Sequence, residues 1–129
     1  MNHRGFITLL SVLLIGAVGF SIGAALLWFG VGAGKTSLAA SQSAEARSLA
    51  NACAEEALEQ IRGNTDFSGQ GNLIIGNGGC TYNVTKQAGE NRQINAVGTV
   101  ATLTRKVKVT LDTITQQIHI ASWQEVADF

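Results

Sequence analysis

The chain has 129 residues, with nine Lys and Arg balanced by nine Asp and Glu, 15 glycines and no proline. This length supports one modest domain, and the balanced charge excludes a global field that would draw the protein to nucleic acid or acidic lipid. Frequent glycine without proline favours long uninterrupted elements joined by glycine turns.

A short basic leader, residues 1–5 (MNHRG), precedes a long apolar segment. No charged residue occurs between Arg4 and Lys35. As a helix, residues 6–34 would be about 44 Å long, against a hydrocarbon core of about 30 Å. The apolar region of a secretory signal peptide is shorter, about 7 to 15 residues. We therefore expect residues 6–34 to span a membrane once.

The distribution of positive charge does not orient this span, because Arg4 precedes it while Lys35 and Arg47 follow it. The cysteines give a second argument. Cys53 and Cys80 could pair in an oxidising compartment but would stay reduced in the cytoplasm. We predict a single-pass protein of the cytoplasmic membrane whose C-terminal domain is extracytoplasmic.

Glycines inside the span recur at three-, four- and seven-residue intervals. They are Gly16, Gly19, Gly23, Gly30 and Gly34. This spacing places them along one stripe of a helix and includes two G-x-x-x-G pairs, which allow a neighbouring helix to approach closely in lipid. The alternative is that membrane helices simply tolerate glycine.

The stretch from Gly30 to Ser37, GVGAGKTS, is close to the phosphate-binding pattern G-x-x-x-x-G-K-[ST]. The first glycine should stand at Phe29, so the pattern fails by one residue. A phosphate loop also follows a buried strand, whereas this stretch follows an apolar helix. We therefore predict no nucleotide cofactor and no enzymatic activity.

Arg4, Gly5 and Phe6, followed directly by a long apolar helix, resemble the start of type IV pilins and type II secretion pseudopilins. The resemblance covers the N-terminal third in detail and the remainder only as architecture. It implies cleavage between Gly5 and Phe6 by a prepilin peptidase, N-methylation of Phe6, and retention of the helix. It also implies other pilin subunits and a membrane assembly platform as partners, and a final place in a surface filament or a periplasmic pseudopilus.

One position departs from that family. Major pilins carry glutamate at the fifth mature residue, where it is thought to neutralise the terminal amine of a neighbour, and here that residue is Leu10. An amine buried without a carboxylate is costly. Minor pilins and K-type pseudopilins thought to act at a filament tip also lack this glutamate, so the resemblance favours a minor, tip-located subunit. The alternative is an ordinary subunit that tolerates a neutral residue.

Residues 35–62 predict an amphipathic continuation of the helix, since they are rich in Ala, Leu, Glu, Gln and Arg. One face is apolar at Ala46, Leu49, Ala50, Cys53, Ala54, Ala57, Leu58 and Ile61. Arg62 complements the helix dipole, and Gly63 is expected to end the helix as a left-handed cap.

Cys53 lies on this apolar face, and Cys80 opens an alternating run in which Cys80, Tyr82 and Val84 share a face. A disulfide from the helix to the first strand would stabilise the fold by about 3 kcal/mol. Two buried thiols or a metal site are alternatives, but only His3 and His119 could add imidazole, so no metal is predicted.

Residues 63–129 predict a small antiparallel meander, giving an α+β, pilin-like fold. Residues 64–79 are expected to form a loop with a brief strand signal at Leu73–Ile75. Three more alternating runs are expected, with short connections at residues 89–91, 101–103 and 112–113. Their apolar positions are Ile94, Ala96, Gly98 and Val100, then Val107, Val109 and Leu111, then Ile114, Ile118 and Ile120 with Trp123 nearby.

Two further features of residues 63–129, a histidine and a basic run, do not predict a catalytic site. His119 lies in a strand-like run without a serine or cysteine motif, so we expect a strand-face histidine. Lys106 and Lys108 could contact DNA phosphates, although a basic strand that resists aggregation is the more common reading. We predict a filament subunit; a membrane-anchored, non-polymerising binding module is the alternative.

Overall fold

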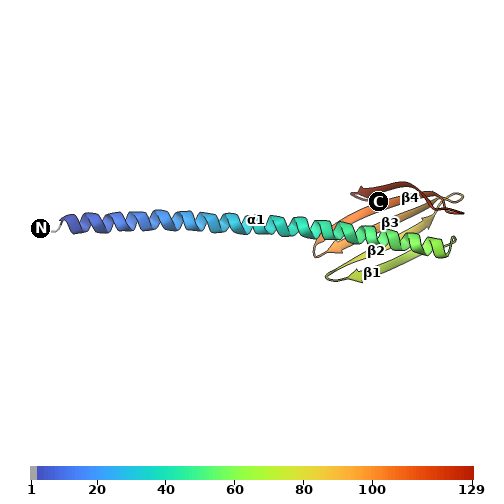
Figure 1. Cartoon of the computed structure of the whole chain (residues 1–129), viewed down its shortest axis with the longest axis horizontal. Coiled ribbons are helices and arrows are strands. Elements are labelled where there is room, and N and C mark those ends of the chain that lie inside the picture. Colours follow the sequence, from blue (N-terminus) through green and yellow to red (C-terminus); the bar gives the residue numbers. More distant parts are fainter. Residues whose placement is uncertain (1–2) are drawn as a thin grey trace. The chain divides into compact units, whose positions relative to one another are not determined.

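The computed structural model describes residues 3–129 and has an α+β architecture, as predicted (Figure 1). One helix, α1 (His3–Gly63), is followed by five strands: β1 (Gly69–Ile75), β2 (Gly78–Lys86), β3 (Arg92–Val100), β4 (Leu103–Thr113) and β5 (His119–Val126). The chain divides into two compact units, one ending at Leu38 and the other comprising Ala39–Phe129, which are described separately.

The second unit is built on residues 39–63 of α1. Its buried helical positions are Ala46, Leu49, Ala50, Cys53, Ala54, Ala57, Leu58 and Ile61. These are the eight positions that the apolar periodicity predicts, so this face of the helix is confirmed. Five of the eight are Ala or Cys, and such small side chains let the helix backbone lie close to the sheet.

The end of the helix differs from the prediction. α1 includes Gly63, which is not among the glycines with positive φ, so it does not form a left-handed cap. Instead, the Asn64 amide donates to the Gln60 carbonyl at 3.0 Å. The Asn64 side chain then accepts from the Asp66 amide at 3.0 Å. This asparagine turn ends the helix without a left-handed glycine.

The sheet is an antiparallel meander in the order β1-β2-β3-β4-β5, which confirms the predicted topology. β3 lies at its centre and alternates strictly between buried and half-buried residues. Ile94 and Val109 are fully buried and directly opposite each other. The helix-facing side of the sheet therefore forms one core with α1, while the other side is left uncovered by the helix.

The predicted loop at residues 64–79 is wrong at residues 69–72 and 78–79, which are strand, whereas the strand signal at Leu73–Ile75 is confirmed. The segment contains all of β1, whose residues pair with β2 from Gly69 opposite Val84 to Ile75 opposite Gly78. The strand needs glycine at position 71, because the Tyr82 ring occupies the place that a Cβ on Gly71 would take. The disulfide-bearing strand is consequently the second strand, not the first.

The last strand also differs from the prediction. Asp112 and Thr113 belong to β4, and the connection to β5 is longer than expected. Ile114 is buried within this connection, where the Glu90 carboxylate accepts its amide at 3.2 Å and accepts the Thr115 hydroxyl. Hydrogen bonds from Thr115 and then Ile114 hold the pKa of Glu90 below its ordinary value.

A register shift in β5 places two apolar residues on the same face. Trp123 lies opposite Val109, and Ile120 lies opposite Leu111, although three positions separate Ile120 from Trp123. Simple alternation would put such residues on opposite faces, but one extra residue in the strand restores a common face. Both side chains therefore lie on the side of the sheet that faces α1.

Candidate membrane anchor and disulfide-braced domain

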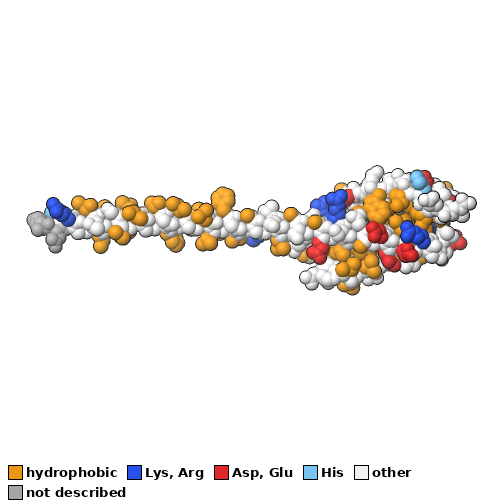
Figure 2. Space-filling view, viewed as in Figure 1, with side chains coloured by type: hydrophobic (Ala, Val, Ile, Leu, Met, Phe, Trp, Pro, Cys, Tyr) orange, Lys and Arg blue, Asp and Glu red, His pale blue; other side chains and the backbone are white. Residues whose placement is uncertain are grey.

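Residues 3–38 of α1 form an apolar helix whose apolar side chains are not buried against any other described residue. Every residue of this segment is exposed except Ala24, which is half-buried. Trp28 and Phe29 are each 81% exposed. Apolar side chains run along the segment in Figure 2. A helix that is apolar all round needs an apolar environment, either lipid or other helices.

Within residues 3–129, one helix is long and apolar enough to cross a membrane, and the mean hydropathy of its most apolar 18-residue window is 2.3. This helix is a candidate membrane anchor. Hydropathy and length alone are weak grounds, because a signal sequence near the N-terminus has the same properties.

Four of the five hydroxyl groups in this segment, those of Thr8, Ser11, Ser21 and Thr36, are hydrogen-bonded to the helix backbone. Thr8, Ser11 and Ser21 donate to the carbonyls of Arg4, Ile7 and Ala17, at 2.8, 2.9 and 2.9 Å. An unsatisfied hydroxyl in hydrocarbon would cost several kcal/mol, on the order of 4 to 8. These bonds reduce the cost of placing the segment in lipid.

Three predicted processing and assembly positions lie on this helix. Gly5 is helical, and Phe6 and Leu10 are 67% and 51% exposed. Met1 and Asn2, the rest of the predicted leader, lie outside the described residues. No described side chain approaches Leu10 closely enough to bury it.

The glycine stripe is likewise open. Nothing lies within 4 Å of a Cβ added to Gly16, Gly19, Gly23, Gly30 or Gly34. Because all five positions are helical, they lie along one side of the helix, with Leu26 and Leu27 between Gly23 and Gly30 on that side. This side would let a second helix backbone come close, as the G-x-x-x-G spacing predicts.

The stretch from Gly30 to Ser37 forms no phosphate loop. All eight residues are helical, so their amides point along the helix axis and cannot wrap a phosphate. The Thr36 hydroxyl donates to the Gly32 carbonyl at 3.1 Å. This geometry supports the interpretation that these glycines belong to the helix surface.

The predicted Cys53–Cys80 disulfide is present and joins α1 to β2, with the two Cα atoms 6.0 Å apart. Both cysteines are buried. The bridge closes a loop with a sequence separation of 27 residues that includes all of β1. It therefore ties the helix to the sheet at a point where the chain between them is long.

Next to the bridge, Gly98 allows the closest approach of helix and sheet. It pairs with Cys80 on one side and Arg105 on the other. A Cβ on Gly98 would overlap the Ala46 carbonyl oxygen and would lie 2.6 Å from the Ala50 nitrogen. Sequence reasoning placed Gly98 on the apolar face but did not assign it this contact, although glycine inside a strand is a known sign of close backbone approach.

Polar contacts hold the remaining edges of the unit. Glu125 of β5 accepts from Arg105 at 2.9 Å and from Arg47 of the helix at 3.1 Å, and Arg105 also donates to the Ser43 hydroxyl at 2.8 Å. The guanidinium of Arg92 is buried and donates to three backbone carbonyls, including that of Thr65 at 3.1 Å. None of these contacts was predicted from the sequence, and most of them join residues far apart in the chain.

His119 begins β5, and its Nδ1 lies 2.7 Å from a carboxylate oxygen of Asp112 in an exposed pair. Within residues 3–129, no group of three or more His, Cys, Asp or Glu side chains is placed to hold a metal ion. In the basic run of β4, Lys106 pairs with Asp128 at 2.6 Å and lies 5.4 Å from the centre of the Phe129 ring.

Comparison of the chain with protein-family models, with characterised proteins and with solved structures gave no match.

Proposed function

We propose that the protein is a structural subunit of a type IV pilus-like filament, anchored in the cytoplasmic membrane before assembly. The observation that carries the proposal is the exposed apolar helix of residues 3–38, joined in one continuous α1 to a disulfide-braced sheet domain. This layout matches the pilin-like architecture that residues 4–6 suggest. The first part of the helix would pack with other helices, first in lipid and then in the filament.

The apolar surface is too large to remain in water. Exposed contiguous apolar patches on soluble monomers are typically about 300–600 Å², and larger ones mark membrane or protein contacts. Here large apolar side chains continue from Phe6 to Leu38. Lipid would cover them before assembly, and the helices of neighbouring subunits would cover them afterwards.

Leu10 favours a minor subunit at the tip of the filament. In a stacked bundle, a terminal amine of one subunit would meet the fifth mature residue of another, and a leucine offers it no charge. A subunit with nothing stacked beyond it avoids this arrangement.

The test is N-terminal mass analysis of full-length protein extracted from membranes. The proposal predicts a polypeptide that starts at Phe6 and carries one added methyl group. A Gly5→Leu variant should retain residues 1–5, since the peptidase would no longer recognise the junction. A wild-type polypeptide that keeps the leader would favour the alternative, a membrane-anchored binding module that does not polymerise.

A further inference from the structure

The second unit contains one basic side chain, Lys108, that reaches neither a carboxylate nor a backbone carbonyl. Of the Lys and Arg residues in Ala39–Phe129, all but Lys108 reach a carboxylate or a backbone carbonyl. Lys108 is half-buried on the face of the sheet that α1 does not cover. Its cross-strand neighbours are Asn95 and Gln124, and Asn83 lies opposite Asn95, so the row contains amides but no acid.

Two carboxylates on the helix are similarly unmatched. Glu45 and Glu55 are exposed, and neither forms an ion pair or a hydrogen bond within the unit Ala39–Phe129. They belong to a ridge on the side of the helix that faces away from the sheet. Its residues recur at intervals of four and three positions. We define this outer ridge as Ser41, Glu45, Ser48, Ala52, Glu55 and Glu59. Its side chains are either small or acidic.

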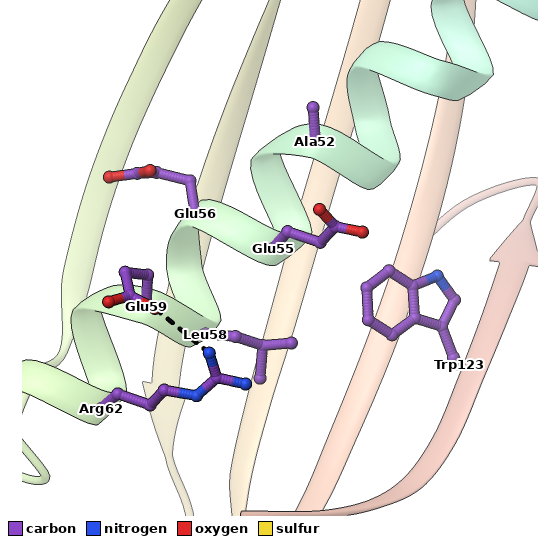
Figure 3. Close-up of a pocket in the computed structure, with 7 residues that line it drawn as sticks. All are labelled: Ala52, Glu55, Glu56, Leu58, Glu59, Arg62 and Trp123. Carbon is purple, nitrogen blue, oxygen red and sulfur yellow. Dashed lines mark hydrogen bonds and ion pairs between the residues drawn. The ribbon is translucent and has the colours of Figure 1, made fainter.

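Glu55 also lines a groove between the helix and β5. The groove has a volume of about 550 Å³, and Trp123 forms its far wall (Figure 3). The Glu55 carboxylate points to the side on which Trp123 lies, whereas Glu56 points to the opposite side of the helix. The indole is 36% exposed. A carboxylate beside an exposed indole suits a lysine ammonium, which would gain an ion pair and a cation–π contact.

Glu55 and Lys108 lie at the same level of the unit, on opposite sides of it. Lys108 is adjacent to Val109, and Val109 lies opposite Trp123. The Trp123 indole donates to the Asn51 side chain at 3.0 Å, one helical turn before Glu55. A second copy displaced sideways, with no shift along the helix axis, would therefore bring its Lys108 to this Glu55.

We propose that two copies of the protein bind side by side, with Lys108 on the sheet face of one copy in the Glu55–Trp123 groove of the other. The inference rests on the proposed membrane anchor, because anchors that cross one membrane in the same direction place both second units on the same side of it. When two anchors lie at the same depth in the membrane, the N-terminal amine of one copy does not lie beside Leu10 of the other. The two surfaces are different, so the contact is heterologous and leaves one of each free.

The experiment uses full-length protein reconstituted in phospholipid vesicles, with self-association measured by energy transfer between labelled copies at increasing dilution. Glu55→Lys and Lys108→Glu should each weaken association by about tenfold or more, because each places like charges together. The double variant Glu55→Lys/Lys108→Glu should return to within about threefold of the wild type, since opposite charges meet again. Lys86→Glu is the matched control, because its ammonium pairs with Asp66 at 3.1 Å within the unit.

Three results would count against the contact. The double variant could remain as weak as either single variant, Lys86→Glu could weaken association as much as Lys108→Glu, or the wild type could stay monomeric in the vesicles. Extraction of the vesicles with alkaline carbonate distinguishes a failure of the proposed contact from a failure of the proposed function. Release of the protein would overturn the anchor and with it this contact, whereas retention of a monomer would overturn the contact alone.

Discussion

Gly98 sets how closely α1 approaches the sheet, because the helix backbone occupies the space in which a side chain would start. A Cβ at this position would overlap the Ala46 carbonyl oxygen. That atom belongs to a helix also fixed by the neighbouring disulfide at Cys53, so the helix cannot simply move away. A single methyl group should therefore strain the whole contact.

We predict that Gly98→Ala lowers the free energy of unfolding of the second unit by about 3 kcal/mol, since overpacking at a rigid contact usually costs 1 to 3 and sometimes more. Urea unfolding can be followed by Trp123 fluorescence in a Trp28→Phe background. Gly63→Ala is the matched control, because nothing lies within 4 Å of an added Cβ there. Equal stability of the two variants would show that the helix does not rest on Gly98.

Tyr82 is the only tyrosine of the chain and is buried where β2 meets the helix. Burial, and then the nearby negative charge of Glu56, raise its pKa above the ordinary value of 10.0. The folded state therefore favours the neutral phenol. This contribution to stability is fully present below pH 10, and it is lost as the pH rises through the folded pKa.

We predict that tyrosinate absorbance of the folded protein titrates above pH 10.0, and that of the urea-unfolded protein near it. Between pH 9 and 11, stability should fall more steeply for the wild type than for Tyr82→Phe, which keeps the ring beside Gly71 without the ionising group. Lysine titration affects both proteins, so the difference between them isolates the phenol. Parallel pH profiles would contradict the assignment.

At the scale of the elements, the disulfide is the main covalent constraint on the second unit. Its closed loop contains the end of α1, the asparagine turn and the whole of β1. β1 pairs with a single neighbour, β2, and its Ile74 is 82% exposed, so few other contacts hold it. The bridge therefore matters most for this edge of the sheet.

We predict that the Cys53→Ala/Cys80→Ala variant is destabilised by about 3.5 kcal/mol, the loop-entropy value for a closed loop of this size. Hydrogen exchange should increase first in β1. A reducing agent should lower the stability of the wild type and leave the variant unchanged. If the reduced wild type kept the protection of β1, the bridge would not be what holds that strand.

Some elements could be predicted from the sequence and others could not. Elements formed by contacts between residues close in the chain were predictable, whereas elements that depend on contacts between distant residues were not. The eight buried helix positions were predictable because a 3.6-residue period is a local property. β1 was not, since its glycines and amides read as a loop and become a strand only by pairing with β2. Two other features depend on how distant segments are aligned with each other, which composition does not encode. They are the bulge that aligns Ile120 with Trp123 and the ion pairs of Glu125.

At the scale of the whole molecule, the chain combines two units with opposite requirements. Residues 39–129 bury their apolar side chains against one another, whereas residues 3–38 expose theirs. A disulfide forms readily in an oxidising compartment, and a helix that is apolar all round is stable in lipid or against other helices. An anchored subunit that later packs in a filament meets both requirements.

The central claim is that the apolar helix lies in a bilayer with its glycine stripe against another helix, and cysteine crosslinking in membranes tests it most directly. Gly23→Cys lies on the stripe, and Ala25→Cys lies at almost the same depth but about 160° away around the helix. Oxidation should crosslink Gly23→Cys to the helix of a neighbouring subunit and leave Ala25→Cys uncrosslinked. Equal crosslinking of the two, or none at either, would contradict the claim.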